Sequence, residues 1–243
     1  MVAQTPPAVV QIAQHVQSQE RGAVVFRLQR IFDVHAGPMH RHDEMELALV
    51  NDDGRTVEVR VIRALTGGKA ADANGIAQIE NQYEHPAPLD VFHRPFDPQF
   101  TGEYAYEAVD AQTYKFKTSL RDGSHGDGSF SLDNEGNVVK YQYAPAVMPR
   151  YATSGTVVDE RAQVLPNFWA VTRESQQYSG HYAIFGGGAT VKIQYDSFRR
   201  FPDAASAVAA LNAACGSTSG LCPDFSTIQS TTGATHGVRT PRK

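Results

Sequence analysis

Residues 114–143 read YKFKTSLRDGSHGDGSFSLDNEGNVVKYQY, and this stretch decides the fold class. Apolar and aromatic residues alternate with polar ones in three short runs, as Tyr114 and Phe116 do in the first, and this is the period of β-strands. The runs are separated by RDGSHGDG and DNEGN, whose Gly, Asp and Asn residues are typical of turns. Strands joined by such short turns pair as antiparallel neighbours. The stretch therefore predicts an antiparallel meander.

The same signals recur on both sides of it. Residues 24–34 place Phe26, Leu28 and Phe32 on one strand face, with Arg30 interrupting that face. Residues 44–50 and 56–65 alternate around the turn NDDG and predict a hairpin. The other runs with strand character are 103–109, 112–120, 127–133, 137–143, 153–160, 167–175, 180–185 and 189–198. We expect about eleven strands in a mainly β (α+β) fold.

A helix is expected at each end of the chain. Pro6 and Pro7 suit a first helical turn, and apolar residues recur at helical spacing from Val9 to Val16. Residues 203–215 form an alanine-rich second helix. A long antiparallel sheet that is apolar on one face must curl, so we expect a curved half-barrel with the helices on its concave side. The helices either fill that side, giving an ordinary core, or leave an apolar groove that takes an acyl chain.

Strand signals fade between residues 66 and 101. GGKAADANG is turn and loop material, and four prolines punctuate a stretch that still holds Phe92, Phe96 and Phe100. Two interpretations stay open for it: a structured cover packed on the body, which we favour, and a linker between domains.

The chain divides into three parts. Residues 1–7 are expected to be a disordered N-terminus, residues 8–215 one folded domain, and residues 216–243 a poorly ordered Ser/Thr/Gly-rich tail. Cys215 and Cys222, the only cysteines, flank a flexible six-residue spacer. They form either a disulfide in an oxidising compartment, which we favour, or two reduced thiols.

Composition excludes several classes of function. The net charge of -4 and the absence of a long basic run argue against nucleic acid as a partner. No apolar stretch reaches the roughly 18 to 20 residues that cross a bilayer. The first residues lack the pattern of a signal peptide. We therefore expect either a cytosolic protein or an exported one whose signal is missing from this sequence.

One cluster suggests metal chemistry. His40 and His42 alternate onto one face of an extended chain, and Glu46 follows four residues later, so the spacing resembles the first metal motif of cupins. The second cupin motif is absent, and solvated loop residues are the plainer interpretation. FGGGAT at 185–190 is expected to be a hairpin turn, because it lacks the Lys-Ser/Thr that closes a phosphate-binding loop. We expect no catalytic residue and no cofactor.

Taken together, the opening helix, the NDDG hairpin, the proline-rich excursion and the meander at 114–143 resemble the LolA/LolB-like superfamily of periplasmic lipoprotein carriers and outer-membrane lipoprotein-sorting proteins. The likeness covers roughly residues 8–200. It implies a half-barrel with an apolar cavity between sheet and helices, a lipid ligand and an extracytoplasmic location. The resemblance also implies an arginine that holds such carriers closed, for which Arg30 is the candidate, whereas the helix at 203–215 departs from the pattern of the superfamily.

The leading hypothesis is a non-enzymatic exported protein that binds a lipid, an acylated protein or another long apolar ligand. An envelope protein is a further expected partner, and peripheral contact with a membrane is compatible with this function. The expected cavity residues are Phe26, Leu28, Phe32, Leu47, Leu49, Val59, Val61, Phe116, Trp169 and Ile184, with Phe92 and Phe100 in the cover. Two alternatives stay open: a metal-binding protein or metalloenzyme using His40, His42 and Glu46, and a structural envelope domain whose cavity is packed.

Overall fold

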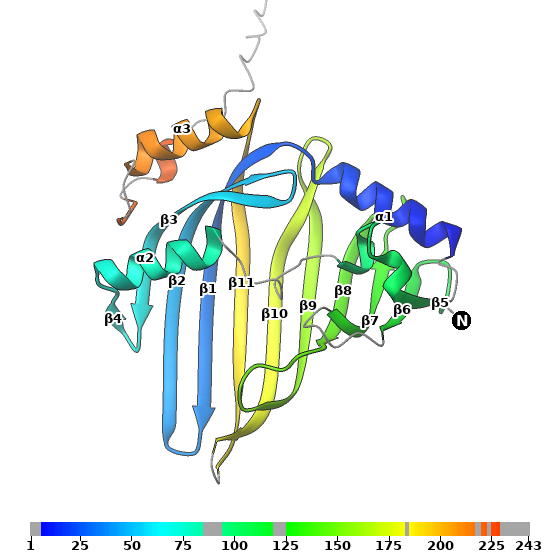
Figure 1. Cartoon of the computed structure of the whole chain (residues 1–243), viewed down its shortest axis with the longest axis horizontal. Helices are drawn as coiled ribbons and strands as arrows, with labels where there is room; N and C mark the ends of the chain where they lie inside the picture. Colours follow the sequence, from blue (N-terminus) through cyan, green and yellow to red (C-terminus); the bar gives the residue numbers. More distant parts are fainter. Residues whose placement is uncertain are drawn as a thin grey trace, which may run out of the picture.

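The protein is built on one sheet of eleven strands, seen here in a computed structural model that describes residues 6–84, 94–118, 125–182, 185–216, 220–222 and 225–228. All paired strands of the sheet are antiparallel, in the order β4-β3-β2-β1-β11-β10-β9-β8-β7-β6-β5 (Figure 1). The strands are β1 (Ala23–Ala36), β2 (Met39–Asp52), β3 (Arg55–Thr66), β4 (Lys69–Ala70), β5 (Tyr104–Ala108), β6 (Thr113–Thr118), β7 (His125–Leu132), β8 (Val138–Pro145), β9 (Ala152–Leu165), β10 (Phe168–Tyr182) and β11 (Phe185–Phe201).

The predicted mainly β, antiparallel fold with eleven strands is confirmed, although two strands differ. The runs expected at 167–175 and 180–185 form one continuous strand, β10, and β4 is a short strand that alternation did not reveal. The glycines of FGGGAT, expected in a hairpin turn, instead belong to β11 and pair with β1 and β10. The half-barrel curvature stays a prediction.

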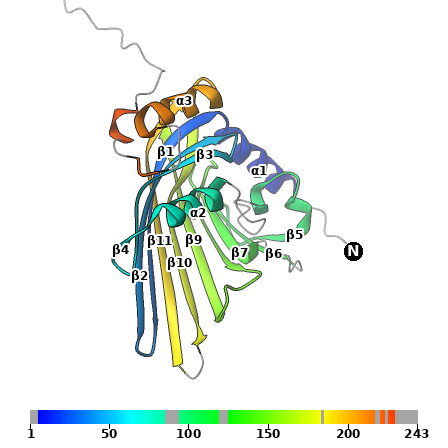
Figure 2. The same ribbon diagram turned by 60° about the vertical axis from the view of Figure 1, so that its left-hand side comes forward.

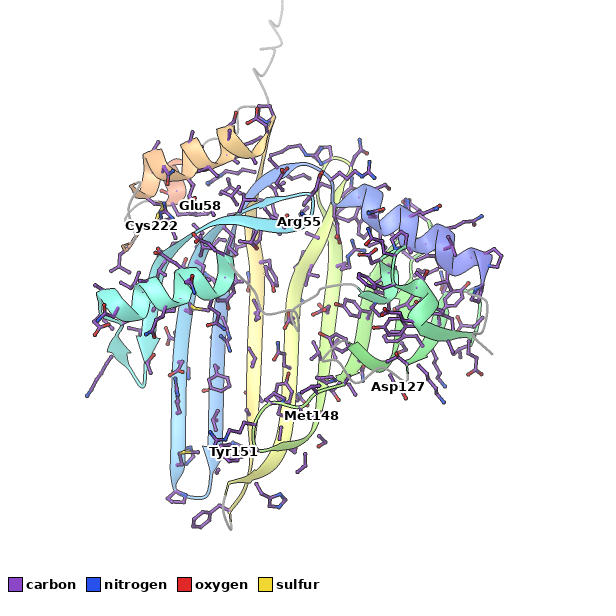
Figure 3. The ribbon with its side chains drawn as sticks, viewed as in Figure 1. Arg55, Glu58, Asp127, Met148, Tyr151 and Cys222 are labelled. Carbon is purple, nitrogen blue, oxygen red and sulfur yellow. A yellow bond between two sulfur atoms is a disulfide. The ribbon has the colours of Figure 1, made fainter. Side chains whose placement is uncertain are left out.

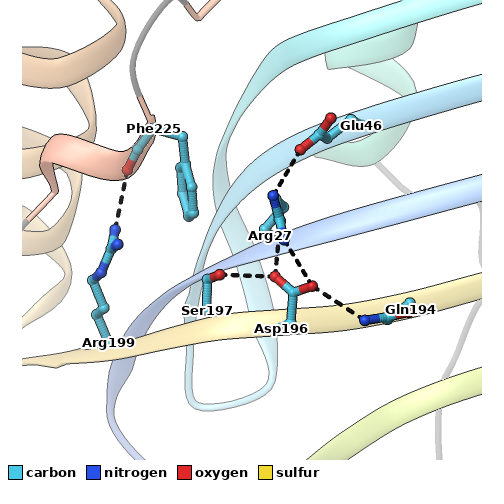
Figure 4. Close-up of polar contacts among 7 residues, drawn as sticks. All are labelled: Arg27, Glu46, Gln194, Asp196, Ser197, Arg199 and Phe225. Atoms are coloured by element: carbon cyan, nitrogen blue, oxygen red, sulfur yellow. Dashed lines mark hydrogen bonds and ion pairs between the residues drawn. The ribbon is translucent and has the colours of Figure 1, made fainter.

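Strand β1 joins the two ends of the chain. It pairs with β2 on one side and with β11 on the other, so that Arg30 lies opposite Met45 and opposite Ile193. Arg27 ties the same three strands together (Figure 4): its guanidinium donates to both carboxylate oxygens of Asp196 on β11, at 2.8 and 3.0 Å, and to Glu46 on β2 at 3.2 Å. The N-terminal hairpins and the C-terminal meander therefore form one continuous sheet.

The pairing register defines two faces. Residues that lie opposite one another share a face, and successive residues of a strand alternate between faces. One row across the sheet contains Ala64, Met45, Arg30, Ile193, Glu174, Asp159 and Tyr141. We call the face of this row the front face. Arg27, Glu46 and Asp196 lie on the back face.

Helix α1 (Pro7–Gln19) covers part of the front face, as its spacing predicts. Pro7 occupies the first turn, and Val9, Ala13 and Val16 are buried. Val16 packs in an aromatic cluster with the short 3-10 helix η2 (Arg94–Phe96) and with β5 to β8. The buried members of that cluster are Phe96, Tyr104, Phe116, Phe130, Val138 and Tyr141. The described end of the proline-rich segment thus packs against the body.

Helix α2 (Ala73–Glu84) also covers the front face and was not predicted. Its sequence, ANGIAQIENQYE, carries few apolar residues and has Asn-Gly in its first turn, which is typical of a loop. Ile76 is nevertheless buried against the front-face residues of β1 to β3, and Ile79 and Tyr83 pack beside it. Tertiary packing overrides the weak local signal here.

Helix α3 (Ala204–Cys215) lies on the back face, which corrects the expectation that both terminal helices share one side of the sheet. Leu211 and Ala207 pack against Val25 and Val50, whose neighbours Val24 and Leu49 face α2 instead. Figures 1 and 2 show α3 at the end of the sheet where β1 begins and β11 ends. The two helices could not be assigned to one face from the sequence. Helical periodicity shows that a helix has an apolar side, but it does not show which face of the sheet that side covers.

The segment after α3 is anchored to it. The predicted disulfide between Cys215 and Cys222 is confirmed, with the two Cα atoms 4.2 Å apart. Phe225 and Ile228 are buried against α3, and Arg199 donates to the Phe225 carbonyl at 3.1 Å (Figure 4). Part of the expected tail is therefore packed. None of the helices within the described ranges is both long and apolar enough to cross a membrane.

The back-face position of α3 predicts a specific stability difference between two leucines. Leu211→Ala should lower the free energy of unfolding by about 2–5 kcal/mol, because it leaves a cavity beneath α3. Leu221→Ala is the matched control, since Leu221 is 56% exposed, and it should change the free energy by no more than about 0.5 kcal/mol. Urea unfolding followed by circular dichroism measures both. Equal effects would contradict the packing of α3 described here.

Candidate functional site

The lower front face, formed by the parts of β1, β11 and β10 beyond Arg30, is the candidate site. Apolar and small residues lie opposite one another on these strands. Phe32 on β1 lies opposite Val191 on β11, and Val34 lies opposite Ala189, which in turn lies opposite Tyr178 on β10. In Figure 1, α1 and α2 lie across the upper part of the sheet, and the lower ends of β1, β2, β10 and β11 extend beyond both. An apolar strand surface therefore continues past the helices.

A cavity of about 370 Å³ lies on this surface. Its far wall is formed by residues 149–152, at the end of the connection from β8 to β9 that passes in front of the sheet with Tyr151 (Figure 3). The residues of the sheet that line it include Arg30, Phe32, Val34, Ala36, Gln176, Tyr178, Ala189 and Val191. The volume lies within the range of about 300–1,000 Å³ that is usual for small-molecule sites.

One glycine lets the wall approach the sheet. The backbone N–H of His181 donates to the Tyr151 carbonyl at 3.1 Å. A Cβ atom on the neighbouring Gly180 would lie only 1.9 Å from the same oxygen, so another residue there would push the wall away. Gly180 therefore fixes the connection close to β10.

The lining carries positive charge. Arg30 and Arg150 line the cavity, and its lining includes no carboxylate among the residues that the structure describes. Each guanidinium also contacts an aromatic ring, Arg30 that of Phe32 at 5.6 Å and Arg150 that of Tyr151 at 4.7 Å.

Two buried carboxyl groups lie above the cavity. Asp159 is fully buried, and Glu174 lies opposite it on β10 with 5% exposure. The Tyr195 hydroxyl donates to Glu174 at 3.3 Å, and the Gln176 amide, which also lines the cavity, donates to its other oxygen. Burial and the nearby charge of Glu174 raise the pKa of Asp159 to about 8, and a hydrogen bond from Tyr141 only partly offsets this. Asp159 is thus protonated at neutral pH, which limits the charge buried there.

An ion pair fixes α1 above these carboxyls. Arg161, whose side chain is fully buried on β9, donates to Glu20 at 2.5 Å and to the Val138 carbonyl at 3.3 Å. Glu20 directly follows α1, so the pair holds the end of the helix on the front face. The upper front face is therefore closed by both apolar packing and charge pairing.

The structure divides the predicted cavity residues into separate groups. Phe32 lines the cavity, and Phe116 packs beneath α1. Trp169 is half-buried opposite Gln163, and Phe100 is half-buried beside the 3-10 helix η3 (Thr101–Glu103). Phe92 and Ile184 lie outside the described residues. Six others are 0–9% exposed in the core beneath α2: Phe26, Leu28, Leu47, Leu49, Val59 and Val61.

The sequence did not predict most of the other residues that line the cavity. Tyr178 and Gly180 were placed in or next to a gap between two predicted strands, and Arg150 and Tyr151 belong to a stretch, APAVMPRY, that received no interpretation. Residues 175–179 read SQQYS, a mostly polar run without the alternation that predicts a strand. No local signal marks a connection that folds back over the sheet.

The alternative of a metal site formed by His40, His42 and Glu46 is wrong, because the three side chains contact different neighbours. His42 bonds to Asp33 at 2.6 Å and to Glu44 at 3.1 Å, whereas Glu46 pairs with Arg27 and the His40 ring stacks near that of His35. Within the described ranges, no group of three or more His, Cys, Asp or Glu side chains is arranged to hold a metal ion. These histidines instead border a hollow of about 430 Å³ beside the β1–β2 hairpin.

The chain matches known proteins in structure and not in sequence. No protein-family model and no curated protein sequence matches the chain. Solved structures do match: a domain assigned as an outer membrane lipoprotein-sorting protein from Vibrio parahaemolyticus (11% identity, TM-score 0.39, 79% of this chain and 91% of that one), and a LolA superfamily protein from Nitrosomonas europaea (11%, 0.32, 81% and 93%). A DUF1329 family protein from Desulfovibrio piger also matches (11%, 0.34, 82% and 94%).

The buried carboxyl pair predicts a pH dependence of stability. Between pH about 4, where an unfolded Asp titrates, and pH about 8, folded Asp159 keeps a proton that the unfolded chain has released. The free energy of unfolding should therefore fall as pH rises through this window, by up to about 1.4 kcal/mol per pH unit. Asp159→Asn should flatten the slope and make the protein more stable than wild type at pH 8.5.

Urea unfolding at pH 5, 7 and 8.5 measures the slope. Glu160→Gln is the control, because Glu160 is adjacent in sequence but lies on the back face with a side chain that is 47% exposed. It should keep the wild-type slope in this window. A slope in Asp159→Asn equal to that of wild type would show that the carboxyl does not carry the effect.

Proposed function

We propose that this protein binds a long apolar ligand, such as the acyl chain of a lipid or of an acylated protein, on the lower front face. The observation that carries the proposal is the cavity of about 370 Å³ between this surface and residues 149–152, bounded on the sheet by Phe32, Val34, Ala189 and Val191. The proposal is of a binding protein and assigns it no reaction.

The energetics favour a chain-like ligand. Each methylene that leaves water contributes about 0.8 kcal/mol, so eight methylenes contribute about 6 kcal/mol. Part of this offsets the translational and rotational freedom lost on association. An acyl chain laid along the strand rows gains contact with every second residue of β1 and β11, as Phe32, Val34 and Ala36 lie two residues apart.

Shielding is the proposed mechanism. The apolar chain leaves water between the sheet and the β8–β9 connection, and movement of that connection sets the release of the ligand. The tyrosine at its end, Tyr151, is 50% exposed, so this wall of the cavity keeps contact with solvent. By contrast, the six core residues beneath α2 serve the stability of the fold.

The disulfide supports an extracytoplasmic setting. Disulfides form and persist in oxidising compartments and are rare in the cytosol. The bond between Cys215 and Cys222 therefore favours export, where a carrier for apolar ligands would meet membranes and envelope proteins.

Two adjacent residues on β1 give a matched test of ligand binding. Phe32→Gln places an amide in the cavity, and Ile31→Gln makes the same kind of change on the back face, where Ile31 is 41% exposed. We expect the wild-type protein to enhance the fluorescence of the uncharged apolar probe N-phenyl-1-naphthylamine. Phe32→Gln should weaken probe binding about tenfold, whereas Ile31→Gln should leave it unchanged.

A second variant fills the cavity. Ala189→Phe adds a ring between β1 and β10 and should also weaken binding, although it makes the surface more apolar. Circular dichroism confirms that each variant is folded. Failure of the wild-type protein to bind the probe, or equal loss in the variants at residues 31 and 32, would contradict the proposed function and favour a purely structural domain.

A further inference from the structure

We propose that the ligand is an amphiphile with a negatively charged headgroup, and that Arg30 holds this headgroup at the upper end of the cavity. The inference rests on the proposed function and deepens it, because it names the chemical class of the ligand. It starts from the charges around the cavity, the surroundings of Arg30 and the direction of the apolar rows.

The charge of the cavity lining is opposite to that of the chain. The whole protein carries a net charge of -4, with 26 acidic and 22 basic residues. The described residues around the cavity include Arg30 and Arg150 and no Asp or Glu. A cavity of this kind attracts an anion and disfavours a cationic amphiphile.

Arg30 differs from the other arginines that reach into the sheet. Arg27 pairs with Asp196 and Glu46, and Arg161 pairs with Glu20. Arg30 is half-buried on the front face, its guanidinium lies 5.6 Å from the centre of the Phe32 ring, and within the described ranges it forms no salt bridge. Arginine holds carboxylate and phosphate groups through two parallel hydrogen bonds, and stacking on a ring leaves the edge of the guanidinium open to them.

The nearest acidic group in the same row is already engaged. Glu174 lies on β10, two strands from Arg30, with Ile193 between them. The backbones of β1 and β10 are therefore about 9.6 Å apart across the sheet. Its oxygens accept hydrogen bonds from Tyr195 and Gln176. The arrangement leaves Arg30 available to a ligand on the side of the cavity.

The apolar rows run away from Arg30. Phe32, Val34 and Ala36 follow it at every second position of β1, so the strip from Arg30 to Ala36 extends for about 20 Å toward the hairpin end. An anionic head at Arg30 with its chain along this strip satisfies both parts of an amphiphile. The geometry points to Arg30 as the headgroup contact and to Arg150 as a rim residue.

Ligands of one chain length and different charge test the inference. Decanoate, decyl phosphate, decanol and decyltrimethylammonium would each compete with N-phenyl-1-naphthylamine at pH 7.5 and below their micellar concentrations. For wild type, we expect at least one of the two anions to compete about tenfold better than decanol, and the ammonium compound to be the weakest. A stronger decyl phosphate would identify a phosphate ester head, and a stronger decanoate a carboxylate head; either supports an anionic ligand.

The variants locate the headgroup contact. Arg30→Gln should remove the preference for the anion and leave the affinity for decanol unchanged, whereas Arg30→Lys should keep part of the preference. Arg173→Gln is the matched control, because Arg173 lies on the back face with a side chain that is 75% exposed, and it should retain the preference. Equal competition by decanoate, decyl phosphate and decanol in wild type, or a preference that survives in Arg30→Gln, would overturn the inference while probe binding still supports the proposed function. Loss of probe binding itself would overturn both.

Discussion

The pairing of β1 with β11 is the interaction on which the rest of the structure depends. It joins the first hairpins of the chain to the last strand of the meander, and thereby makes one sheet of eleven strands instead of two smaller ones. Such a sheet is about 50 Å across, and β11, with 17 residues, is about 55 Å long. A helix of 12 or 13 residues is only about 20 Å long and 10 Å wide. The two front-face helices therefore cannot cover the whole front face.

This mismatch in size divides the front face. Its upper part is closed by α1 and α2, and there the sheet buries both apolar side chains and charged ones, with Arg161 paired to Glu20 and Asp159 kept protonated. Among the described residues no helix covers its lower part, where the same strand alternation places the half-buried Phe32 and Val34 against the β8–β9 connection. An uncovered apolar surface of this kind marks a binding site more often than an ordinary surface does. Arg30 lies at the boundary between the two parts.

The sequence supports prediction of strands and faces better than of what covers them. Alternation predicted the antiparallel strands, and it placed Phe26, Leu28, Arg30 and Phe32 on one face, as the register confirms. Cysteine spacing predicted the disulfide. The helix α2 could not be predicted, because only its packing against β1 to β3 offsets a polar, Gly-containing sequence. For the same reason the six core residues beneath α2 were predicted to line a cavity. Alternation identifies an apolar strand face, but whether a helix covers that face depends on the tertiary structure.

Photoaffinity labelling tests the central claim most directly, since it reports where on the sheet an apolar chain lies. A decanoic acid that carries a diazirine near the end of its chain would be bound, irradiated and located by peptide mass spectrometry. We predict labels on lower front-face residues such as Val34, Ala36, Tyr178 and Ala189. Labels concentrated on α3 and the back face, or among the core residues beneath α2, would contradict the division of the front face described above.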